Sequence, residues 1–141
     1  MKFYKYQGAG NDFLIADNRD GSIKLAAEQV AFICDRRYGV GADGLMLLGS
    51  PDNIAHEEES VKLPDFVMTY YNSDGSGGMM CGNGGRCIVA FAADMGVEAS
   101  GEDGTYVFEA ADGLHTAQVI MDEGKVKTVR IKMKDVSEAV H

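Results

Sequence analysis

Apolar residues in this 141-residue chain gather in short runs that polar and glycine-rich segments separate. Residues 2–7 and 12–17 have the length and composition of strands, and the glycine-rich segment between them predicts a tight turn. Similar runs predict strands at residues 45–48, 66–71, 106–108, 114–121 and 125–133, the last two joined by a hairpin turn at residues 122–124. The polar residues 50–62 are typical of a surface loop.

Two segments follow the helical period instead. Residues 25–37 place apolar side chains three and four positions apart, and the glycines at positions 39 and 41 are expected to end this helix. Residues 86–95 are apolar on nearly every side, which is typical of a buried helix, and Gly96 is expected to stop it. These elements indicate an α+β fold, with a mixed, mostly antiparallel curved sheet wrapped around the central buried helix. Residues 1–141 are expected to form one domain.

The composition narrows the classes of function. A hydrophobic fraction of 45% and a charged fraction of 25% are ordinary for a soluble globular protein. No apolar run approaches the roughly 18 residues of a membrane span, and the N-terminus lacks the features of a signal peptide. We therefore expect a cytoplasmic protein that does not bind a membrane. The net charge of −9 repels a phosphate backbone, so nucleic acid is not an expected partner.

The three cysteines, Cys34, Cys81 and Cys87, are an odd number without a CxxC pair. This count argues against a disulfide framework and against a structural zinc site. The three histidines are scattered, with no spacing that indicates a metal site or a catalytic triad. Cys34 and Cys87 lie inside apolar helical patterns, so both are interpreted as packing residues.

Cys81 has different neighbours, because it lies between the glycine-rich residues 72–78 and the predicted buried helix. A helix N-terminus carries N–H groups without intrahelical acceptors and a partial positive charge, and both favour a thiolate or a bound carboxylate. A thiol, whose ordinary pKa is about 8.5, becomes a usable base near neutral pH when its anion is favoured in this way. Asn72 and Asn83 carry short amides that can donate to and accept from a zwitterionic ligand.

These features leave alternatives open. Cys81 is either a functional thiol or a small packing residue. The glycine-rich run also has the character of a phosphate-binding loop, although it lacks the GxxxxGK[ST] pattern and its lysine. Asn11 is either a ligand contact or a turn asparagine in the left-handed conformation. The acidic residues 57–59 are interpreted as a solvated loop.

Four segments carry a more specific resemblance: residues 8–13 (Gly-Ala-Gly-Asn-Asp-Phe), 37–44 (Arg-Tyr-Gly-Val-Gly-Ala-Asp-Gly), 71–76 (Tyr-Asn-Ser-Asp-Gly-Ser) and 81–86 (Cys-Gly-Asn-Gly-Gly-Arg). In this order and spacing they resemble the N-terminal half of the diaminopimelate epimerase family, over essentially the whole chain. Members of that family interconvert LL- and meso-diaminopimelate in lysine and cell-wall precursor synthesis, without pyridoxal phosphate or another cofactor. Each of their two similar domains supplies one cysteine to a cleft. One thiolate removes the α-proton, and the opposite thiol returns a proton on the other face.

The resemblance implies roles for five residues. Cys81 matches the N-terminal catalytic cysteine. Gly82 and Asn83 match positions whose backbone N–H groups bind the α-carboxylate, where negative charge grows as the α-carbon becomes a carbanion. Asn11 and Asn72 match substrate-binding asparagines toward the distal amino-acid end of diaminopimelate. Some members have a glutamine contact at position 44, where this chain has a glycine, so the resemblance implies that this contact is absent.

The resemblance also implies a partner outside the chain. Members of the family are about twice as long, and their second cysteine, acidic and arginine contacts and second asparagine-rich loop lie downstream of the part that matches residues 1–141. We therefore expect an N-terminal domain whose partner is the C-terminal domain of the same full-length enzyme, and we expect the chain alone not to racemise at a useful rate. A solitary domain would expose its cleft wall, so self-association, in the simplest case as a homodimer, is also expected.

Other functions remain as alternatives. A proline or hydroxyproline racemase of the same fold would act on a substrate without a second polar end, which the distal asparagines argue against. A non-catalytic module that retains the carboxylate pocket would leave the Cys81 thiol reacting near its ordinary pKa. A thiol hydrolase lacks a convincing histidine partner within this chain.

Overall fold

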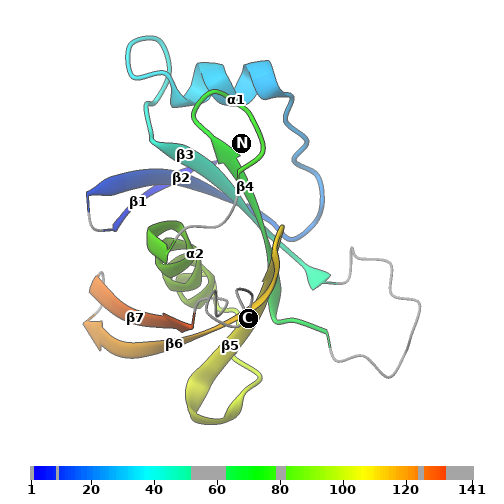
Figure 1. Cartoon of the computed structure of the whole chain (residues 1–141), viewed down its shortest axis with the longest axis vertical. Coiled ribbons are helices and arrows are strands. Elements are labelled where there is room, and N and C mark those ends of the chain that lie inside the picture. The colour runs from blue at the N-terminus through cyan, green and yellow to red at the C-terminus, as the bar shows by residue number, and fades with distance from the viewer. Residues whose placement is uncertain (1, 9, 52–62, 79–81, 124–125, 133–141) are drawn as a thin grey trace, which may run out of the picture.

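The structure is a computed structural model that describes residues 2–8, 10–51, 63–78, 82–123 and 126–132. Within these residues, seven strands form one sheet in sequence order, and two α-helices pack on it (Figure 1). The strands are β1 (Tyr4–Gly8), β2 (Asn11–Asn18), β3 (Gly44–Gly49), β4 (Phe66–Asn72), β5 (Thr105–Ala110), β6 (Gly113–Glu123) and β7 (Val126–Lys132); the helices are α1 (Ala27–Cys34) and α2 (Gly82–Asp94), with a short 3-10 turn, η2, at Glu102–Gly104.

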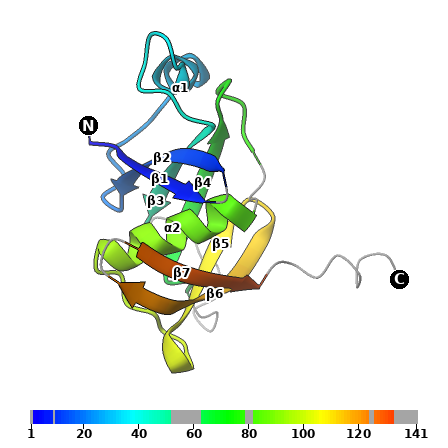
Figure 2. The same ribbon diagram turned by 90° about the vertical axis from the view of Figure 1, so that its left-hand side faces the viewer.

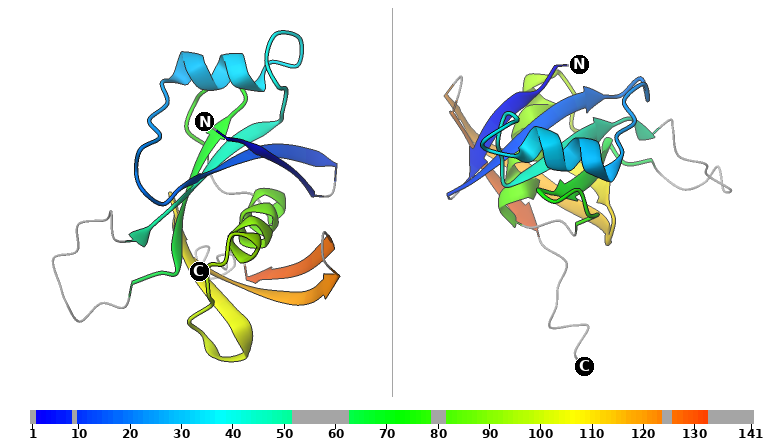
Figure 3. Two further views of the ribbon diagram at one scale, coloured as in Figure 1. Left: turned by 180° about the vertical axis from the view of Figure 1, so that it is seen from behind. Right: turned by 90° about the horizontal axis from the view of Figure 1, so that it is seen from above.

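The sheet is mixed and strongly curved. The β2–β3 and β4–β5 pairs are parallel, and the other four neighbouring pairs are antiparallel. The sheet curls so far that its two edge strands, β1 and β7, lie on either side of α2 (Figure 2). Helix α2 fills the inside of the curve, while α1 lies above it on the other face (Figure 3). The predicted α+β fold, with a mostly antiparallel curved sheet around a buried helix, is confirmed.

Alternating side chains of the central strands divide the core into two clusters. In β2, Phe13 and Ile15 pack toward α2, whereas Leu14 packs toward α1 with Val30. Side chains of a strand point to opposite faces in turn, so a strand that is covered on both faces becomes continuously apolar. All of residues 13–16 are buried for this reason. The larger cluster surrounds α2, whose buried Ile88 and Phe91 lie at its centre.

Helix α1 is shorter than the predicted helix at residues 25–37. It ends at Cys34 because the carboxylate of Asp35 accepts the backbone N–H groups of Arg37 and Tyr38, at 2.8 and 3.0 Å. A side-chain acceptor of this kind offers backbone donors an alternative to the helix. The chain then folds back, and the N–H groups of residues 40–42 donate to carbonyls of the last helical turn. This fold-back brings residues 36–43 over the start of β2.

Helix α2 begins at Gly82, four residues before the predicted start at residue 86. Glycine disfavours helix by about 1 kcal/mol per residue relative to alanine, which is why the local pattern placed the start later. Tertiary packing outweighs that preference, since Gly84 and Gly85 are buried. The C-terminal end agrees with the prediction: Gly96 has a φ of 84° and donates to the carbonyl of Ala93, as in a Schellman cap.

The other elements differ from prediction only at their ends. The predicted turn at residues 122–124 begins later, because β6 continues through Glu123 after an irregularity between Val119 and Met121. The predicted loop at residues 50–62 and strand end at residue 133 lie largely outside the described residues. Neither α1 nor α2 combines the length and apolar character that a bilayer-crossing helix requires. The fold brings Gly8 at the end of β1 and Asn11 at the start of β2 against the start of α2.

Candidate active site

The start of α2 lies against the first residue of β2. The amide nitrogen of Asn83 donates to the side-chain oxygen of Asn11 at 2.8 Å, between residues 72 positions apart. Gly8 at the end of β1 allows a close approach to α2, because a Cβ atom there would lie 3.2 Å from the Sγ atom of Cys87 and 3.4 Å from the carbonyl oxygen of Asn83. Three of the predicted site residues, Asn11, Gly82 and Asn83, are therefore together at the N-terminus of the central helix.

The structure excludes a left-handed turn conformation for Asn11. Gly10 has the left-handed backbone, with a φ of 93°. Asn11 does not: it is already in the β2 strand, where it pairs with Gly8. The turn geometry therefore depends on glycine, and the asparagine side chain is available for contacts with α2.

Asn72 is the last residue of β4 and lies at the same end of the sheet. It pairs with Gly44 of β3, which in turn pairs with Phe13 of β2. Its side-chain amide nitrogen donates to the hydroxyl of Ser76 at 3.0 Å, and its backbone carbonyl accepts the N–H of Gly75 at 2.9 Å. The side chain is thus engaged in its own turn, not with the Asn11–Asn83 pair.

The turn after β4 is packed tightly against the rest of the molecule. Gly75 has a φ of 89°, and a Cβ atom there would lie 2.1 Å from the carbonyl oxygen of Ala27 in α1. At Gly78, a Cβ atom would lie 2.4 Å from the ring of Tyr70 and 2.9 Å from the amide oxygen of Asn72. Glycine is required at both positions because the backbone passes directly over these groups.

The predicted catalytic residue, Cys81, lies outside the described residues. Its neighbour in the sequence, Gly82, is the first residue of α2. The other two thiols are buried, that of Cys34 at the end of α1 and that of Cys87 in α2, in agreement with their interpretation as packing residues. Burial raises the pKa of the Cys34 thiol above its ordinary value.

Gly44, where the resemblance implies a lost glutamine contact, is buried in β3. A Cβ atom there would lie 2.9 Å from the hydroxyl of Tyr70 and 3.1 Å from the carbonyl oxygen of Tyr71. A larger side chain at position 44 would require the side chain of Tyr70 to move. In this chain, the Tyr70 hydroxyl occupies the space beside the glycine.

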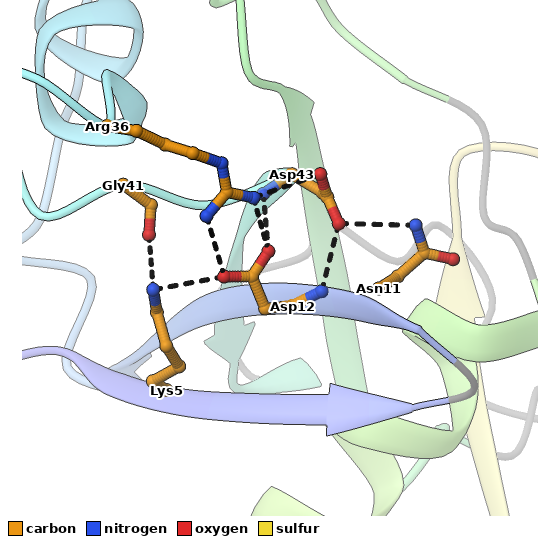
Figure 4. Close-up of polar contacts among 6 residues, drawn as sticks. All are labelled: Lys5, Asn11, Asp12, Arg36, Gly41 and Asp43. Atoms are coloured by element: carbon orange, nitrogen blue, oxygen red, sulfur yellow. Dashed lines mark hydrogen bonds and ion pairs between the residues drawn. The ribbon is translucent and has the colours of Figure 1, made fainter.

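A network of charged residues, shown in Figure 4, supports Asn11 from the side opposite α2. Arg36 donates to both carboxylate oxygens of Asp12, at 3.1 and 2.7 Å, and to one oxygen of Asp43 at 3.1 Å. Lys5 adds a second positive charge 3.0 Å from Asp12. The other oxygen of Asp43 accepts the amide of Asn11 at 3.2 Å and the backbone N–H of Asp12 at 3.0 Å. Asn11, Asp12, Arg36 and Asp43 line a polar cavity of about 360 Å³, together with Gln7 and Gly10.

Sequence reasoning assigned no role to this network. Asp12, Arg36 and Asp43 lie in or next to two of the segments that carry the family resemblance, but their pairing depends on how the chain folds back after α1. The available signal was local: an arginine and an aspartate flank two glycines in residues 36–43. Asp12 is partly buried in its strand, and a carboxylate in such a place is stabilised by a nearby cation.

The Arg36 guanidinium, with help from Lys5, holds the pKa of Asp12 well below its usual range. A carboxylate with a lower pKa in the folded than in the unfolded chain stabilises the fold fully above its unfolded pKa near 4, and the contribution is lost as the pH falls below that value. We therefore expect the free energy of unfolding to decrease between about pH 4 and pH 2. In Asp12→Asn, we expect it to be lower by about 2 kcal/mol at pH 7, with a flatter acid dependence.

Guanidinium titrations followed by circular dichroism at several pH values measure both effects. Glu98→Gln, at an exposed position after α2, is the matched control and should change the free energy of unfolding by less than about 0.5 kcal/mol. An unchanged acid slope in Asp12→Asn would contradict the assignment of this dependence to Asp12.

Of the described residues, His115 is the only histidine, and it does not join this site. His115 is buried in β6, where its Nε2 atom lies 2.7 Å from the carboxylate of Asp112 and its ring packs in a tilted arrangement on Phe108, with the ring centroids 5.4 Å apart. His56 and His141 lie outside the described residues. Among the residues that the structure describes, no group of three or more histidine, cysteine, aspartate or glutamate side chains is arranged to hold a metal ion.

Comparison with known proteins gives a consistent picture. The family model described as diaminopimelate epimerase matches residues 3–137. The diaminopimelate epimerase of Flavobacterium psychrophilum is 43% identical over 142 residues, covering 98% of this chain and 47% of the relative. That of Chlorobaculum tepidum is 44% identical over 131 residues, covering 93% and 45%. The chain therefore spans about half the length of the curated relatives that it matches.

Solved structures of low sequence identity share the fold. A methylitaconate-delta-isomerase superposes with a TM-score of 0.63 at 14% identity, covering 86% of this chain and 34% of the isomerase. A phenazine biosynthesis protein of the PhzF family from Bacillus anthracis superposes with a TM-score of 0.59 at 18% identity, covering 93% and 40%. These similarities concern the arrangement of the sheet around the central helix.

Proposed function

This chain belongs to the diaminopimelate epimerase family, and on that premise we propose that it supplies one half of an active site that inverts the α-carbon of diaminopimelate. The observation that carries this proposal is the contact between Asn11 and Asn83, because it joins two separate family segments at the first turn of α2. In this proposal Cys81 is one of two acid–base groups, and the second comes from the C-terminal domain of the same full-length enzyme.

The start of α2 suits the α-carboxylate of an amino acid. The first N–H groups of a helix have no intrahelical acceptor, and the helix dipole places a partial positive charge there. The guanidinium of Arg86 is also close, since its terminal nitrogens lie 3.4 and 3.6 Å from where a Cβ atom on Gly82 would be. In this proposal the backbone N–H groups of Gly82 and Asn83 bind the carboxylate, and Asn11 and Asn72 contact the distal end of diaminopimelate.

The same donors account for chemistry without a cofactor. Removal of the α-proton by a thiolate leaves a carbanion whose charge spreads into the carboxylate. Fixed N–H donors aimed at that carboxylate stabilise the charge where it develops, and they need no reorganisation during the reaction. Inversion then requires a proton from the opposite face, because a single base would tend to return the proton to the face from which it came. Residues 1–141 alone are therefore proposed to be inactive.

A hybrid enzyme tests this proposal. The hybrid carries this chain in place of the segment of the Flavobacterium psychrophilum diaminopimelate epimerase with which it aligns. We expect the hybrid to convert LL- to meso-diaminopimelate and to incorporate solvent deuterium at the α-carbon, whereas the 141-residue chain alone does neither. Chiral chromatography and mass spectrometry measure the two outcomes.

Three results would contradict the proposal. Turnover by the isolated chain at the rate of the full relative would exclude the need for a second base. A folded hybrid that racemises proline or hydroxyproline in preference to diaminopimelate would favour a racemase of the same fold. A folded hybrid that binds diaminopimelate without any α-proton exchange would favour a non-catalytic carboxylate-binding module.

A further inference from the structure

The two asparagines at the candidate site lie within a chain of hydrogen bonds whose ends have a defined polarity. At one end is Asp43, whose ionised carboxylate only accepts hydrogen bonds; at the other is Arg86, whose guanidinium only donates them. Between them lie Asn11 and Asn83, each with an amide that can donate from nitrogen and accept at oxygen. The end groups therefore decide how both amides are oriented.

The Asp43 end determines the orientation of Asn11. One carboxylate oxygen of Asp43 accepts the side-chain amide of Asn11 at 3.2 Å and the backbone N–H of Asp12 at 3.0 Å. The other oxygen accepts from Arg36 at 3.1 Å. Since a carboxylate only accepts hydrogen bonds, Asn11 must turn its amide nitrogen toward Asp43. Its amide oxygen then faces α2.

The orientation continues to the helix. The oxygen of Asn11 accepts from the amide nitrogen of Asn83 at 2.8 Å, so the oxygen of Asn83 faces the other way. There it accepts from the guanidinium of Arg86 at 3.0 Å. Both end groups impose the same direction on this series of hydrogen bonds. If either amide were flipped, two donors or two acceptors would face each other.

Asp43 is itself held firmly. Its backbone N–H donates to the backbone carbonyl of Asp12 at 3.0 Å and to the carboxylate of Asp12 at 3.1 Å. Arg36 bridges the two carboxylates, and its backbone and side chain pack against Gly41, where a Cβ atom would lie 3.0 Å away. The position of the Asp43 carboxylate is thus fixed by the fold-back after α1 (Figure 4).

We propose that Asp43 is a positioning residue, which sets the amide orientation of Asn11, and through it that of Asn83, so that each asparagine presents a fixed pattern of donors and acceptors to the substrate. This inference rests on the proposed function and deepens it, because it explains what prepares the asparagines for diaminopimelate. Asp43 acts through Asn11 and does not itself contact the substrate.

Asp43→Asn is the informative substitution, because it keeps the size and shape of the side chain. It replaces one acceptor with an NH₂ group, which must face either Arg36 or the Asn11–Asp12 donors. The charged guanidinium of Arg36 is the stronger donor, so we expect the amide oxygen to stay on Arg36 and the NH₂ group to face Asn11 and Asp12, which removes the acceptor that orients Asn11. Asp17→Asn is the matched control: Asp17 also pairs with an arginine through two hydrogen bonds, at 2.8 and 2.7 Å, but at the other end of β2.

The orientation itself can be measured on the 141-residue chain by NMR. In the unmodified chain we expect a nuclear Overhauser contact between the Asn11 side-chain amide and the backbone N–H of Asp12, since both donate to one oxygen. In Asp43→Asn this contact is expected to disappear, and the side-chain resonances of Asn83 are expected to shift although Asn83 does not contact Asp43. Unchanged Asn11 and Asn83 side-chain signals would overturn the inference.

A double-mutant cycle in the hybrid enzyme tests the consequence for the reaction. We expect Asp43→Asn to raise KM for diaminopimelate about tenfold with kcat changed less than about twofold, since it removes binding that ground state and transition state share. On an Asn11→Ala background the same substitution should have no further effect on KM. Asp17→Asn should leave both constants unchanged.

The outcomes separate this inference from the proposed function. Equal, additive increases of KM with and without Asn11→Ala would show a general structural effect and overturn the positioning role. A normal KM in Asp43→Asn would overturn it as well. If Asp43→Asn does not fold, Arg36→Gln releases the same carboxylate and is subject to the same cycle. A folded hybrid without any turnover of diaminopimelate refutes the proposed function, while the NMR measurement still decides whether Asp43 orients the asparagines.

Discussion

Replacing Cys81 with alanine is expected to lower the epimerisation rate of the hybrid enzyme by about a thousandfold. A positioned acid–base group contributes roughly 10²- to 10⁴-fold to the rate of a proton transfer, and the proposed reaction has only one such group on each face of the substrate. Substrate binding should change much less, because the proposed binding groups are the backbone N–H groups of α2 and the side chains of Asn11 and Asn72. The measurement is kcat and KM for both diaminopimelate isomers.

The chain offers two controls for this substitution. Cys87 and Cys34 are buried, at 4% and 3% exposure, and each of their alanine variants removes the same atom as Cys81→Ala. Both are expected to cost stability and to leave kcat of the folded enzyme nearly unchanged. A Cys81→Ala variant with normal kcat, or a Cys87→Ala variant that is folded but inactive, would mean that the catalytic thiol has been assigned to the wrong position.

Replacing Phe91 with alanine is expected to lower the free energy of unfolding by about 3–5 kcal/mol. Phe91 lies in α2 and is completely buried, and its ring contacts those of Tyr4 and Tyr6 in β1 at centroid distances of 5.2 and 5.6 Å. The substitution removes the largest side chain of the helix and leaves a cavity between α2 and an edge strand. This loss is a large fraction of the roughly 5–15 kcal/mol by which domains are stable.

Chemical denaturation followed by circular dichroism measures this effect. Phe32→Ala makes the same chemical change on α1, where Phe32 is 61% exposed, and is expected to cost less than about 0.5 kcal/mol. If the two variants were equally stable, α2 would not be the centre of the core. Because the same helix presents Asn83 to Asn11, a destabilised but folded Phe91→Ala should also weaken binding at the candidate site.

The predicted elements were correct in type, and the errors were at their ends. The pattern around Val30 and Cys34 predicted α1, but not that Asp35 would take backbone donors and stop the helix three residues before the predicted end. Glycine propensity predicted a later start for α2 than the structure has. In both cases the deciding interaction was a specific contact that a hydrophobic period does not contain.

The candidate site was predictable as a set of segments but not as a geometry. Asn11 and Asn83 were identified from the sequence as candidate site residues. The 2.8 Å hydrogen bond between them follows from the curl of the sheet around α2. The roles of Arg36 and Asp43 had no counterpart in the sequence argument, because they arise from the path of the chain after α1.

By itself the sequence determined the kinds of element, the burial of α2 and the family to which the chain belongs, because periodicity and glycine-rich motifs are properties of neighbouring residues. Only the tertiary structure decided which residues meet at the start of α2 and which way their amides face. Those contacts join segments that are up to 72 positions apart. Their geometry depends on two parallel strand pairs and on the curvature of the whole sheet, which no local pattern specifies.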